Sequence, residues 1–225
     1  MFRKELYVAE PKGKPVRAVI RTYTENDFDA LIDVQKGSFP PPFPSELWWN
    51  REQLHNHVTR FPEGALCVEI DGRVVASMTG LRVQLDPAHT AHTWADVTDE
   101  GYIRNHDPQG DTLYIVDICV LPEFRKLGLG KWMMLSMYEV VVHLGVRRLL
   151  GGGRMSGYHR HADAMSAEEY LEKVVSGDLH DPVISFLLRC GRVPVAVVPN
   201  YLEDEESRHY AALMEWKNPF LQEES

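Results

Sequence analysis

The sequence predicts a single mixed α/β domain, and three observations carry that prediction. An Asp-Gly pair joins the β-rich runs ALCVEI and RVVASMTGLRV, which is a strong signal for a β-hairpin. The run TLYIVDICV is almost continuously apolar, as expected of a strand that is covered on both faces. Soon after it, apolar side chains occupy most faces of a helix expected from Leu129 to Leu144. A chain of 225 residues with this mixture fits one large domain spanning 1–225.

The elements before the hairpin follow from local signals. Residues 16–24 combine β-branched and aromatic side chains and predict a first strand. Asn26 and Asp27 are then suited to cap a helix whose apolar side chains recur at helical spacing. The proline-rich run FPPPFP allows neither helix nor sheet, and Ser45 after it is expected to cap a second helix that reaches about Arg60.

Two stretches interrupt the regular order of elements and predict insertions. Residues 86–111 are rich in Pro, His, Asp, Gly and Asn and show little periodicity. After the expected helix, Val146 to Leu150 predict a strand that ends at the glycine triplet 151–153. Residues 154–180 then form the second insertion, within which AEEYLEKVVSG predicts a helix.

The last part of the chain returns to regular elements. Asp181 and Pro182 stand in the order expected of a helix N-cap and first helical residue, and Gly191 is expected to end that helix. Two further strands are expected near 193–198 and 208–216. Taken in order, the elements predict one mixed sheet with helices between its strands.

The charge balance and the hydropathy pattern argue against nucleic-acid and membrane partners. Lys and Arg number 24 and Asp and Glu 33, so the formal net charge is −9, which argues against a general binder of nucleic acid. The acidic run 203–206 is expected to be a solvated tip between the last two strands, with steering of a cationic amine as the alternative. No stretch approaches the roughly 18 apolar residues that span a bilayer, and the first residues lack a signal-peptide core.

Cysteine and histidine usage also limits the possibilities. The three cysteines are an odd number and lie far apart, which suits free thiols in a reducing compartment. No cysteine or carboxylate completes a familiar zinc spacing around His159 and His161, so no metal site is predicted. We therefore expect a soluble cytoplasmic protein without nucleic-acid or membrane partners, for which a homodimer is the default oligomer.

The run VLPEFRKLGLGK carries the strongest chemical signal. A buried strand ends here, and Arg125-x-x-Gly128-x-Gly130 leads directly into a helix. The glycines allow a ligand to approach the backbone, and a helix start offers free N–H groups and a positive dipole end. The run therefore predicts a cradle for phosphate oxygens. A Walker loop would need glycine at 125, and a Rossmann fingerprint would need a third glycine at 133, so neither motif fits.

The remaining pattern resembles the pyrophosphate loop of the GNAT superfamily of acetyl-CoA-dependent N-acetyltransferases. YIVDICVLPEFRKLGLG is similar to the family's central strand, loop and helix start, and HDPVISFLLRCG is similar to a later helix. The resemblance covers most of the chain outside the two insertions. It implies a mixed, mostly antiparallel central sheet flanked by helices. The insertions and GGGRMSGY also resemble, more weakly, the GNAT domains joined to carbon–nitrogen hydrolase domains, although no hydrolase domain fits in this length.

The resemblance also implies a donor, an acceptor and binding residues. The donor would be acetyl-CoA, and the acceptor a primary amine of a small molecule or peptide. The pantetheine arm would pair with the backbone of Ile118, Cys119 and Val120, where one N–H would stabilise the oxyanion. The pyrophosphate would lie on the N–H groups of Arg125, Lys126, Leu127, Gly128, Leu129, Gly130 and Lys131.

Asp117 is the expected catalytic base. It is the only ionisable side chain in its apolar run, and a carboxylate there would be either paired or raised in pKa. The alternative is a structural aspartate that caps neighbouring backbone groups. Strand alternation places Asp117 and Val120 on opposite faces unless a bulge intervenes.

The chain departs from the family at Leu187, where a tyrosine usually protonates the leaving thiolate. If the coenzyme thiol has a pKa of about 8.5, its thiolate can still leave without an acid, and releasing the unprotonated form at pH 7 costs about 2 kcal/mol. Tyr158 is the first candidate to replace the missing acid, with His159 and His161 behind it; the alternative is a loop tyrosine that packs on the core. Two other functions stay open: a catalytically silent acyl-CoA-binding or sensory module, and a partner-binding scaffold built on the insertions.

Overall fold

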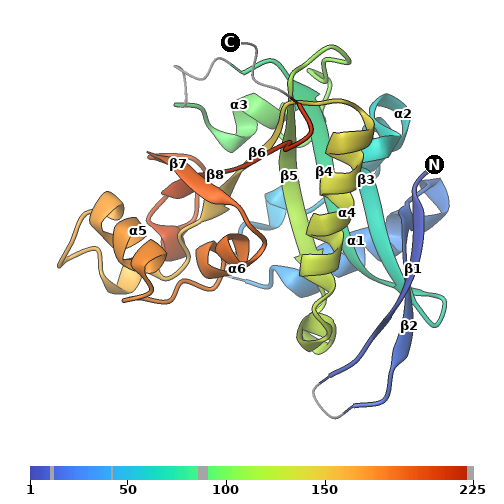
Figure 1. The fold of residues 1–225 in the computed structure, drawn as a ribbon, viewed down its shortest axis with the longest axis horizontal. Coiled ribbons are helices and arrows are strands. Elements are labelled where there is room, and N and C mark those ends of the chain that lie inside the picture. Colours follow the sequence, from blue (N-terminus) through green and yellow to red (C-terminus); the bar gives the residue numbers. More distant parts are fainter. Residues whose placement is uncertain (11–12, 42, 86–90, 222–225) are drawn as a thin grey trace.

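One sheet organises the protein. The computed structural model describes residues 1–10, 13–41, 43–85 and 91–221, and within them an 8-stranded sheet has the order β1-β2-β3-β4-β5-β6-β8-β7 (Figure 1). The strands are β1 (Arg3–Val8), β2 (Val16–Thr22), β3 (Ala65–Ile70), β4 (Arg73–Val83), β5 (Thr112–Val120), β6 (Arg148–Arg154), β7 (Val193–Val198) and β8 (Ala211–Lys217). Strands β5 and β6 pair in parallel, and the other neighbours pair antiparallel. The predicted mixed, mostly antiparallel sheet is confirmed.

Helices cover both faces of this sheet. They are α1 (Phe28–Ser38), α2 (Arg51–Arg60), α3 (Trp94–Thr98), α4 (Leu129–His143), α5 (Ala167–Ser176) and α6 (Ile184–Arg189). Helix α4 crosses one face of the central strands, while α1 and α2 lie on the opposite face (Figure 1). Among the described residues, no helix is both long and apolar enough to cross a membrane.

Several sequence predictions are confirmed at the level of single elements. Strands β3 and β4 form the expected hairpin around Asp71 and Gly72, whose φ angles of 50° and 78° suit a tight turn. The apolar run 112–120 is β5, in the middle of the sheet. Helices α4 and α5 lie where their periodicity placed them. Strand β1 was not predicted, since its alternation of charged and apolar residues is short and mostly exposed.

The predicted start of the second helix is wrong. Helix α2 begins at Arg51, and the side chain of Asn50 accepts the backbone N–H of Gln53 at 2.9 Å. The Gln53 side chain in turn accepts the backbone N–H of Asn50, which completes a capping box. Ser45 starts only a short 3-10 helix (Ser45–Leu47), because Trp48 after it is extended, with a ψ of 143°, and interrupts the helix.

The predicted end of the strand before the glycine triplet is also wrong. Strand β6 continues to Arg154, and its three glycines pair with β8 residue for residue. Large side chains occupy the space that a Cβ would need there. A Cβ on Gly152 would lie 2.3 Å from Cζ of Tyr201, and one on Gly153 would lie 2.7 Å from Cδ1 of Leu187. The triplet therefore continues the strand, and its missing side chains leave the space that Tyr201 and Leu187 fill.

Each of the two insertions contains a helix. Residues 86–90 of the first lie outside the described part, and the remainder contains α3. The second insertion contains α5, and Asp181 joins it to α6. Helix α6 begins at Ile184 with Val183 as its N-cap, so the predicted start at Asp181 and Pro182 is two residues early. Oδ1 of Asp181 still accepts the backbone N–H groups of Val183 and Ile184, while Oδ2 accepts from the Tyr170 hydroxyl at 3.0 Å.

Candidate active site

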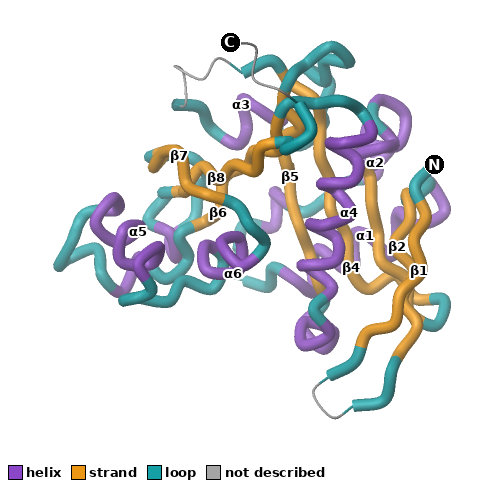
Figure 2. Tube along the Cα trace, viewed as in Figure 1, coloured by secondary structure: helices purple, strands orange, loops and turns teal. Residues whose placement is uncertain are grey.

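The two parallel strands separate and open a cavity between them. Strands β5 and β6 pair only between residues 112–114 and 148–150, and beyond this point they diverge (Figure 2). A cavity of about 170 Å³ lies in the gap, lined by residues 115–118 of β5 and 151–154 of β6. An apolar cavity of similar volume in another protein accommodates benzene, so this space exceeds a bare acetyl group.

The walls of the cavity are mostly apolar, and they come from several elements. The aromatic and aliphatic lining side chains outside β5 and β6 are Phe39, Phe43, Leu47, Trp49, Trp94, Met134, Val183, Phe186, Leu187 and Leu202. The polar lining side chains are Gln35, Asp117, Arg154, Arg192 and Tyr201. A few polar groups in an apolar cleft are typical of a site that binds and orients a small ligand.

A bulge in β5 shapes this wall. Thr79 of β4 lies opposite Asp117, whereas the next residue, Gly80, lies opposite Ile115. Val116 is therefore the extra residue, and its carbonyl oxygen accepts the indole N–H of Trp94 at 2.9 Å. The bulge precedes Asp117, and pairing is regular from there to Val120. Alternation therefore leaves Asp117 and Val120 on opposite faces.

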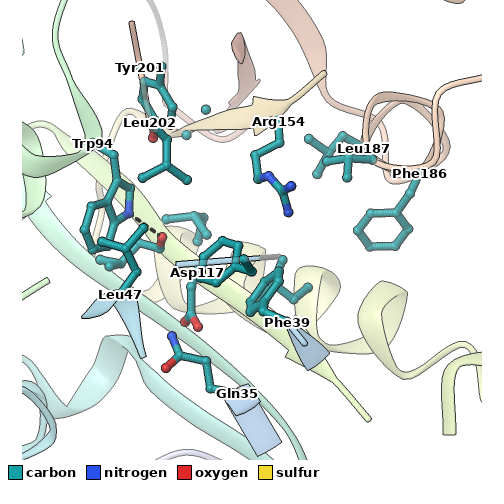
Figure 3. Close-up of a pocket in the computed structure, with 18 of the residues that line it drawn as sticks. Gln35, Phe39, Leu47, Trp94, Asp117, Arg154, Phe186, Leu187, Tyr201 and Leu202 are labelled. Atoms are coloured by element: carbon teal, nitrogen blue, oxygen red, sulfur yellow. Dashed lines mark hydrogen bonds between the residues drawn. The ribbon is translucent and has the colours of Figure 1, made fainter. Parts of the chain in front are cut away.

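Asp117 lies at the centre of the cavity wall, with Gln35 facing it (Figure 3). Oδ2 accepts the Cys119 thiol at 3.1 Å, and Oδ1 is a buried atom without a hydrogen-bond partner among the described residues. Oε1 of Gln35 accepts the backbone N–H of Trp49. The amide nitrogen of Gln35 is therefore the group that can donate to Asp117.

This environment changes the acidity of the carboxyl group. Removal from water raises the pKa of Asp117 to about 6, and hydrogen bonds from Cys119, Gln35 and both the side chain and the backbone of Thr79 offset only part of the rise. Asp117 is half-buried and lines the cavity. A carboxyl group with this pKa can both accept and return a proton near neutral pH.

The predicted phosphate cradle has the expected backbone. A 3-10 helix (Pro122–Leu127) leads to Gly128, whose φ of 71° is left-handed, and α4 begins at Leu129. The amides of Lys131 and Trp132 donate to the Gly128 carbonyl and close the first turn. Within the described residues, no side chain accepts a hydrogen bond from an amide of 125–131. The start of α4 is thus open to a ligand.

The side chain of Arg125 is used inside the protein. Its guanidinium donates to the carbonyl oxygens of Val120 at 3.1 Å and Ser38 at 3.0 Å, which ties the loop to the ends of β5 and α1. Two of the other predicted coenzyme residues, Gly130 and Ile118, come together: a Cβ on Gly130 would lie 3.9 Å from Ile118, and it would lie 3.2 Å from the Phe186 ring. The loop, β5 and α6 therefore meet at one place.

Tyr158 is not brought to Asp117. Its hydroxyl donates to the Met165 carbonyl at 3.1 Å, and its ring packs against Tyr170 and Tyr210. It is not one of the residues that line the cavity, whereas Leu187 is. The geometry matches the packing alternative and gives no support to Tyr158 as the acid.

An ion pair at the cavity was missed from the sequence. The guanidinium of Arg154 extends into the cavity (Figure 3) and binds both carboxylate oxygens of Asp204, at 2.8 and 2.7 Å. Glu206 accepts from the same group at 3.1 Å. Asp204 is buried, so the acidic run 203–206 is not simply a solvated tip. No motif marks Arg154, because its partner is fifty residues away in the chain.

Arg192 is a second cation that the sequence did not single out. It is 2% exposed, and Nη2 donates to the carbonyls of Gly151 and Met214. No carboxylate of the described residues forms an ion pair with it, and burial lowers the pKa of its guanidinium to about 10. An unpaired buried cation that lines a cavity is suited to an anionic group on a ligand.

No metal site emerges from the described part of the chain. It contains no group of three His, Cys, Asp or Glu residues placed to hold an ion. The three cysteines are free and buried, in agreement with the thiols expected from their spacing.

Comparisons with known proteins agree with one another. A family model described as the acetyltransferase (GNAT) family matches residues 28–156. A Bacillus subtilis protein called "Uncharacterized N-acetyltransferase YkwB" is 54% identical over 223 residues, which cover 99% of this chain and 98% of that protein. "Probable hydrolase YhcX" of the same organism is 39% identical over 203 residues, which cover 90% of this chain but 39% of that longer protein.

Two solved structures show the same fold. The loading GNATL domain of CurA from Lyngbya majuscula has a TM-score of 0.77 at 20% identity, covering 89% of this chain and 98% of the domain. The GphF GNAT-like decarboxylase in complex with isobutyryl-CoA has a TM-score of 0.73 at 23% identity, covering 88% and 98%.

Proposed function

The chain belongs to the GNAT acetyltransferase family, and from this premise we propose that it transfers the acetyl group of acetyl-CoA to a primary amine. The acceptor would be a small molecule or the amine of a peptide, bound in the cavity between β5 and β6. The observation that carries the proposal is the position of Asp117, with a free carboxylate oxygen, in an apolar cavity beside an open helix start.

The backbone suits the coenzyme part of this substrate. Around Gly128 the space is open, since a Cβ there would have no atom within 4 Å. The amides at the start of α4 would bind the pyrophosphate, as a helix N-terminus does for anions. Beyond its parallel pairing, β5 has a free edge towards β6, along which the pantetheine arm would pair with Ile118, Cys119 and Val120.

The chemistry then follows from the groups in the cavity. Asp117 takes the proton of the attacking amine, directly or through one water, and passes it to solvent later. The amine nitrogen bonds to the thioester carbon, and a backbone N–H near Val120 stabilises the oxyanion. The C–S bond then breaks and the thiolate leaves without help from Leu187, at a cost of about 2 kcal/mol at pH 7 for a thiol of pKa about 8.5.

The test is release of free coenzyme A from acetyl-CoA with a panel of polyamines, amino acids, aminoglycosides and peptide N-termini. We expect turnover with at least one amine and its loss in Asp117→Asn. Coenzyme binding without any turnover would instead support the silent acyl-CoA-binding module. No binding of coenzyme A in calorimetry would leave the partner-binding scaffold.

A second function is favoured by one observation, the unpaired guanidinium of Arg192 in the cavity wall. We propose as the alternative that a carboxyacyl-CoA binds there and loses carbon dioxide, as the name of the GNAT-like decarboxylase suggests for that protein. The bond between the carboxylate and the α-carbon breaks, and its electron pair passes into the thioester enolate. Asp117, protonated beforehand by solvent, then donates its proton to the α-carbon. Loss of carbon dioxide from malonyl-CoA without any amine would establish this function in place of the first.

A further inference from the structure

The guanidinium of Arg154 extends into the cavity, and the proposed reaction does not use it (Figure 3). Nε and Nη2 bind the two carboxylate oxygens of Asp204, and Nη2 also donates to Glu206 at 3.1 Å. Nη1 has no hydrogen-bond partner among the described residues. Because each terminal nitrogen of a guanidinium carries two N–H groups, Nη1 keeps its donors for a ligand.

The guanidinium is held in place from two sides. Asp204 is 7% exposed and binds it through both carboxylate oxygens, a geometry that fixes the plane of the group. The ring of Phe43 lies 5.5 Å from Cζ of Arg154. Arg154 and Phe43 line the cavity, whereas Asp204 does not. A donor that is already fixed loses little freedom when a ligand binds to it.

Alternation along β6 decides which face of the sheet carries Arg154. A Cβ on Gly153 would lie 2.7 Å from Leu187 of α6, whereas one on Gly152 would meet the ring of Tyr201. Side chains two residues apart in a strand share a face, so Arg154 points to the same face as Gly152. Arg154 therefore lies on the face that is turned away from α6.

The same reasoning places Asp117. The side chain of Ile118 faces the start of α4, because a Cβ on Gly130 would lie 3.9 Å from its Cδ1. Asp117, one residue earlier, points to the opposite face, where Gln35 of α1 faces it (Figure 3). Asp117 and Arg154 thus share the part of the cavity that is turned away from α4 and α6, the helices beside which the coenzyme is expected.

The third charged side chain of the cavity wall lies in the other part. Nη2 of Arg192 would lie 3.5 Å from a Cβ on Gly151, which shares its face of β6 with Gly153. Arg192 therefore belongs to the side of α6. On the side left for the acceptor, Asp117 and Arg154 are the two charged groups that line the cavity within the described chain.

The rest of this part of the wall is mostly apolar. Phe39 and Leu47 border it near Asp117, and Trp94 and Leu202 complete the wall (Figure 3). A ligand that reaches both charged groups must place its remaining atoms against these aromatic and aliphatic side chains. The lining therefore suits a ligand with an amine, an anionic group and an apolar substituent.

We propose that the acceptor is an amino acid with an apolar side chain, whose carboxylate binds Arg154 while its amine faces Asp117. This proposal rests on the proposed function and narrows its acceptor. Arg154 is then a specificity-determining residue, and Asp204 is a positioning residue that acts through it. A polyamine or an aminoglycoside would bring a second cation towards the guanidinium, and such a like-charge contact selects against a ligand.

The test is calorimetry of ligands added to the protein saturated with coenzyme A, which carries no acetyl group to transfer. Phenylalanine is compared with phenylalaninamide, which keeps the amine and the ring but lacks the negative charge, and with phenethylamine. We expect phenylalanine to bind about tenfold or more tightly than either. In Arg154→Gln this preference should fall by about 10- to 100-fold, the range for a hydrogen bond to a charged group.

The matched control is Arg148→Gln. Arg148 lies on the same strand and pairs with the buried Glu215 at 3.2 Å, but it does not line the cavity, so the preference should stay unchanged. If Arg154→Gln does not fold because buried Asp204 is left unpaired, the double variant Arg154→Gln with Asp204→Asn removes both charges together. It should lose the preference to the same extent.

The outcomes separate this proposal from the proposed function. No binding of phenylalanine, equal binding of its amide, or a preference that persists without Arg154 would overturn the carboxylate subsite. Acetylation of phenethylamine as fast as phenylalanine would also overturn it, but would leave acetyl transfer to amines standing. Binding of phenylalanine that depends on Arg154, without release of coenzyme A from acetyl-CoA, would support the subsite and contradict the proposed reaction.

Discussion

The indole nitrogen of Trp94 lies 2.9 Å from the carbonyl oxygen of Val116, the residue that bulges out of the central strand. A bulge removes ladder hydrogen bonds, and a buried carbonyl left without a donor is destabilising. Trp94 belongs to the first insertion, so this insertion completes the strand that carries Asp117. The first insertion therefore contributes directly to the structure of the site.

We expect Trp94→Phe to lower the free energy of unfolding by about 1–3 kcal/mol, because the ring is kept but the Val116 carbonyl loses its donor. Urea unfolding of the variant and the parent measures the difference. Trp132→Phe is the control, since Trp132 is 37% exposed and should change stability by less than about 0.5 kcal/mol. Equal losses in both variants would contradict the role given to the indole N–H.

Asp117→Asn should lower kcat for amine acetylation by about 10²- to 10⁴-fold, the range for loss of a general base. The affinity for acetyl-CoA should stay within about threefold, because the coenzyme contacts expected here are backbone groups of β5 and α4. Steady-state kinetics and calorimetry measure the two quantities. A variant that keeps most of its kcat would remove Asp117 from the mechanism.

The same substitution should change stability in a pH-dependent way. The folded pKa of Asp117 is about 6, above the ordinary 3.8, so the folded state binds the proton more tightly than the unfolded state. Stability from this group is therefore full below pH 4 and is lost as the pH rises through 6, by up to about 3 kcal/mol. We expect Asp117→Asn to be more stable than the parent at pH 7.5, with the gain vanishing near pH 4. Urea unfolding at both pH values tests this, and a gain that is the same at pH 4 would exclude ionisation as its cause.

Gly152→Ala should be strongly destabilising, because its Cβ would overlap the Tyr201 ring, which is hydrogen-bonded to Tyr114 at 2.8 Å. Overpacking of this kind costs about 1–3 kcal/mol, and displacement of the ring adds a lost hydrogen bond. Gly145→Ala is the comparison, since its Cβ meets no atom within 4 Å and only its φ of 62° is unfavourable. Thermal unfolding should show the larger loss at 152; a smaller loss there would mean that Tyr201 moves aside freely.

Tyr158→Phe should leave turnover within about twofold of the parent. The hydroxyl is bonded to the Met165 carbonyl and does not line the cavity, so its removal should cost only about 1 kcal/mol of stability. Rates with a saturating amine and a urea titration measure the two effects. A tenfold fall in kcat would restore Tyr158 as the acid and would require a movement of the second insertion.

The sequence predicted those parts of the fold that local chemistry determines. The turn at Asp71 and Gly72 and the buried run 112–120 each depend on neighbours in the chain, and both were confirmed. The helix expected to start at Pro182 starts at Ile184, although Asp181 still accepts the backbone N–H of Ile184. The strand before the glycine triplet was predicted to end too early, because glycine usually interrupts strands. Here it extends one, to leave room for Tyr201 and Leu187, which approach from distant positions.

The site was predictable to a similar extent. Asp117 could be singled out because an acid in an apolar run is conspicuous, although its role remains a prediction. The ion pair between Arg154 and Asp204 has no sequence signature, since the two residues lie far apart in the chain. Because Leu187 replaces the usual tyrosine, Tyr158 was predicted to act as the acid instead. Tyr158 does not line the cavity, and the sequence alone could not show this.

On the proposed function, the short parallel pairing of β5 and β6 would tie the lifetime of the protein to its coenzyme ligand. Between these strands, the described chain provides backbone pairing only for residues 112–114 with 148–150, so a bound acyl-CoA would supply cohesion that the polypeptide itself lacks. At a ligand concentration of one hundred times Kd, binding adds about 2.7 kcal/mol to the free energy of unfolding. In a cell whose acyl-CoA pool is depleted, the protein would therefore unfold more often and be degraded sooner, so that its abundance would follow the metabolic supply of its own donor.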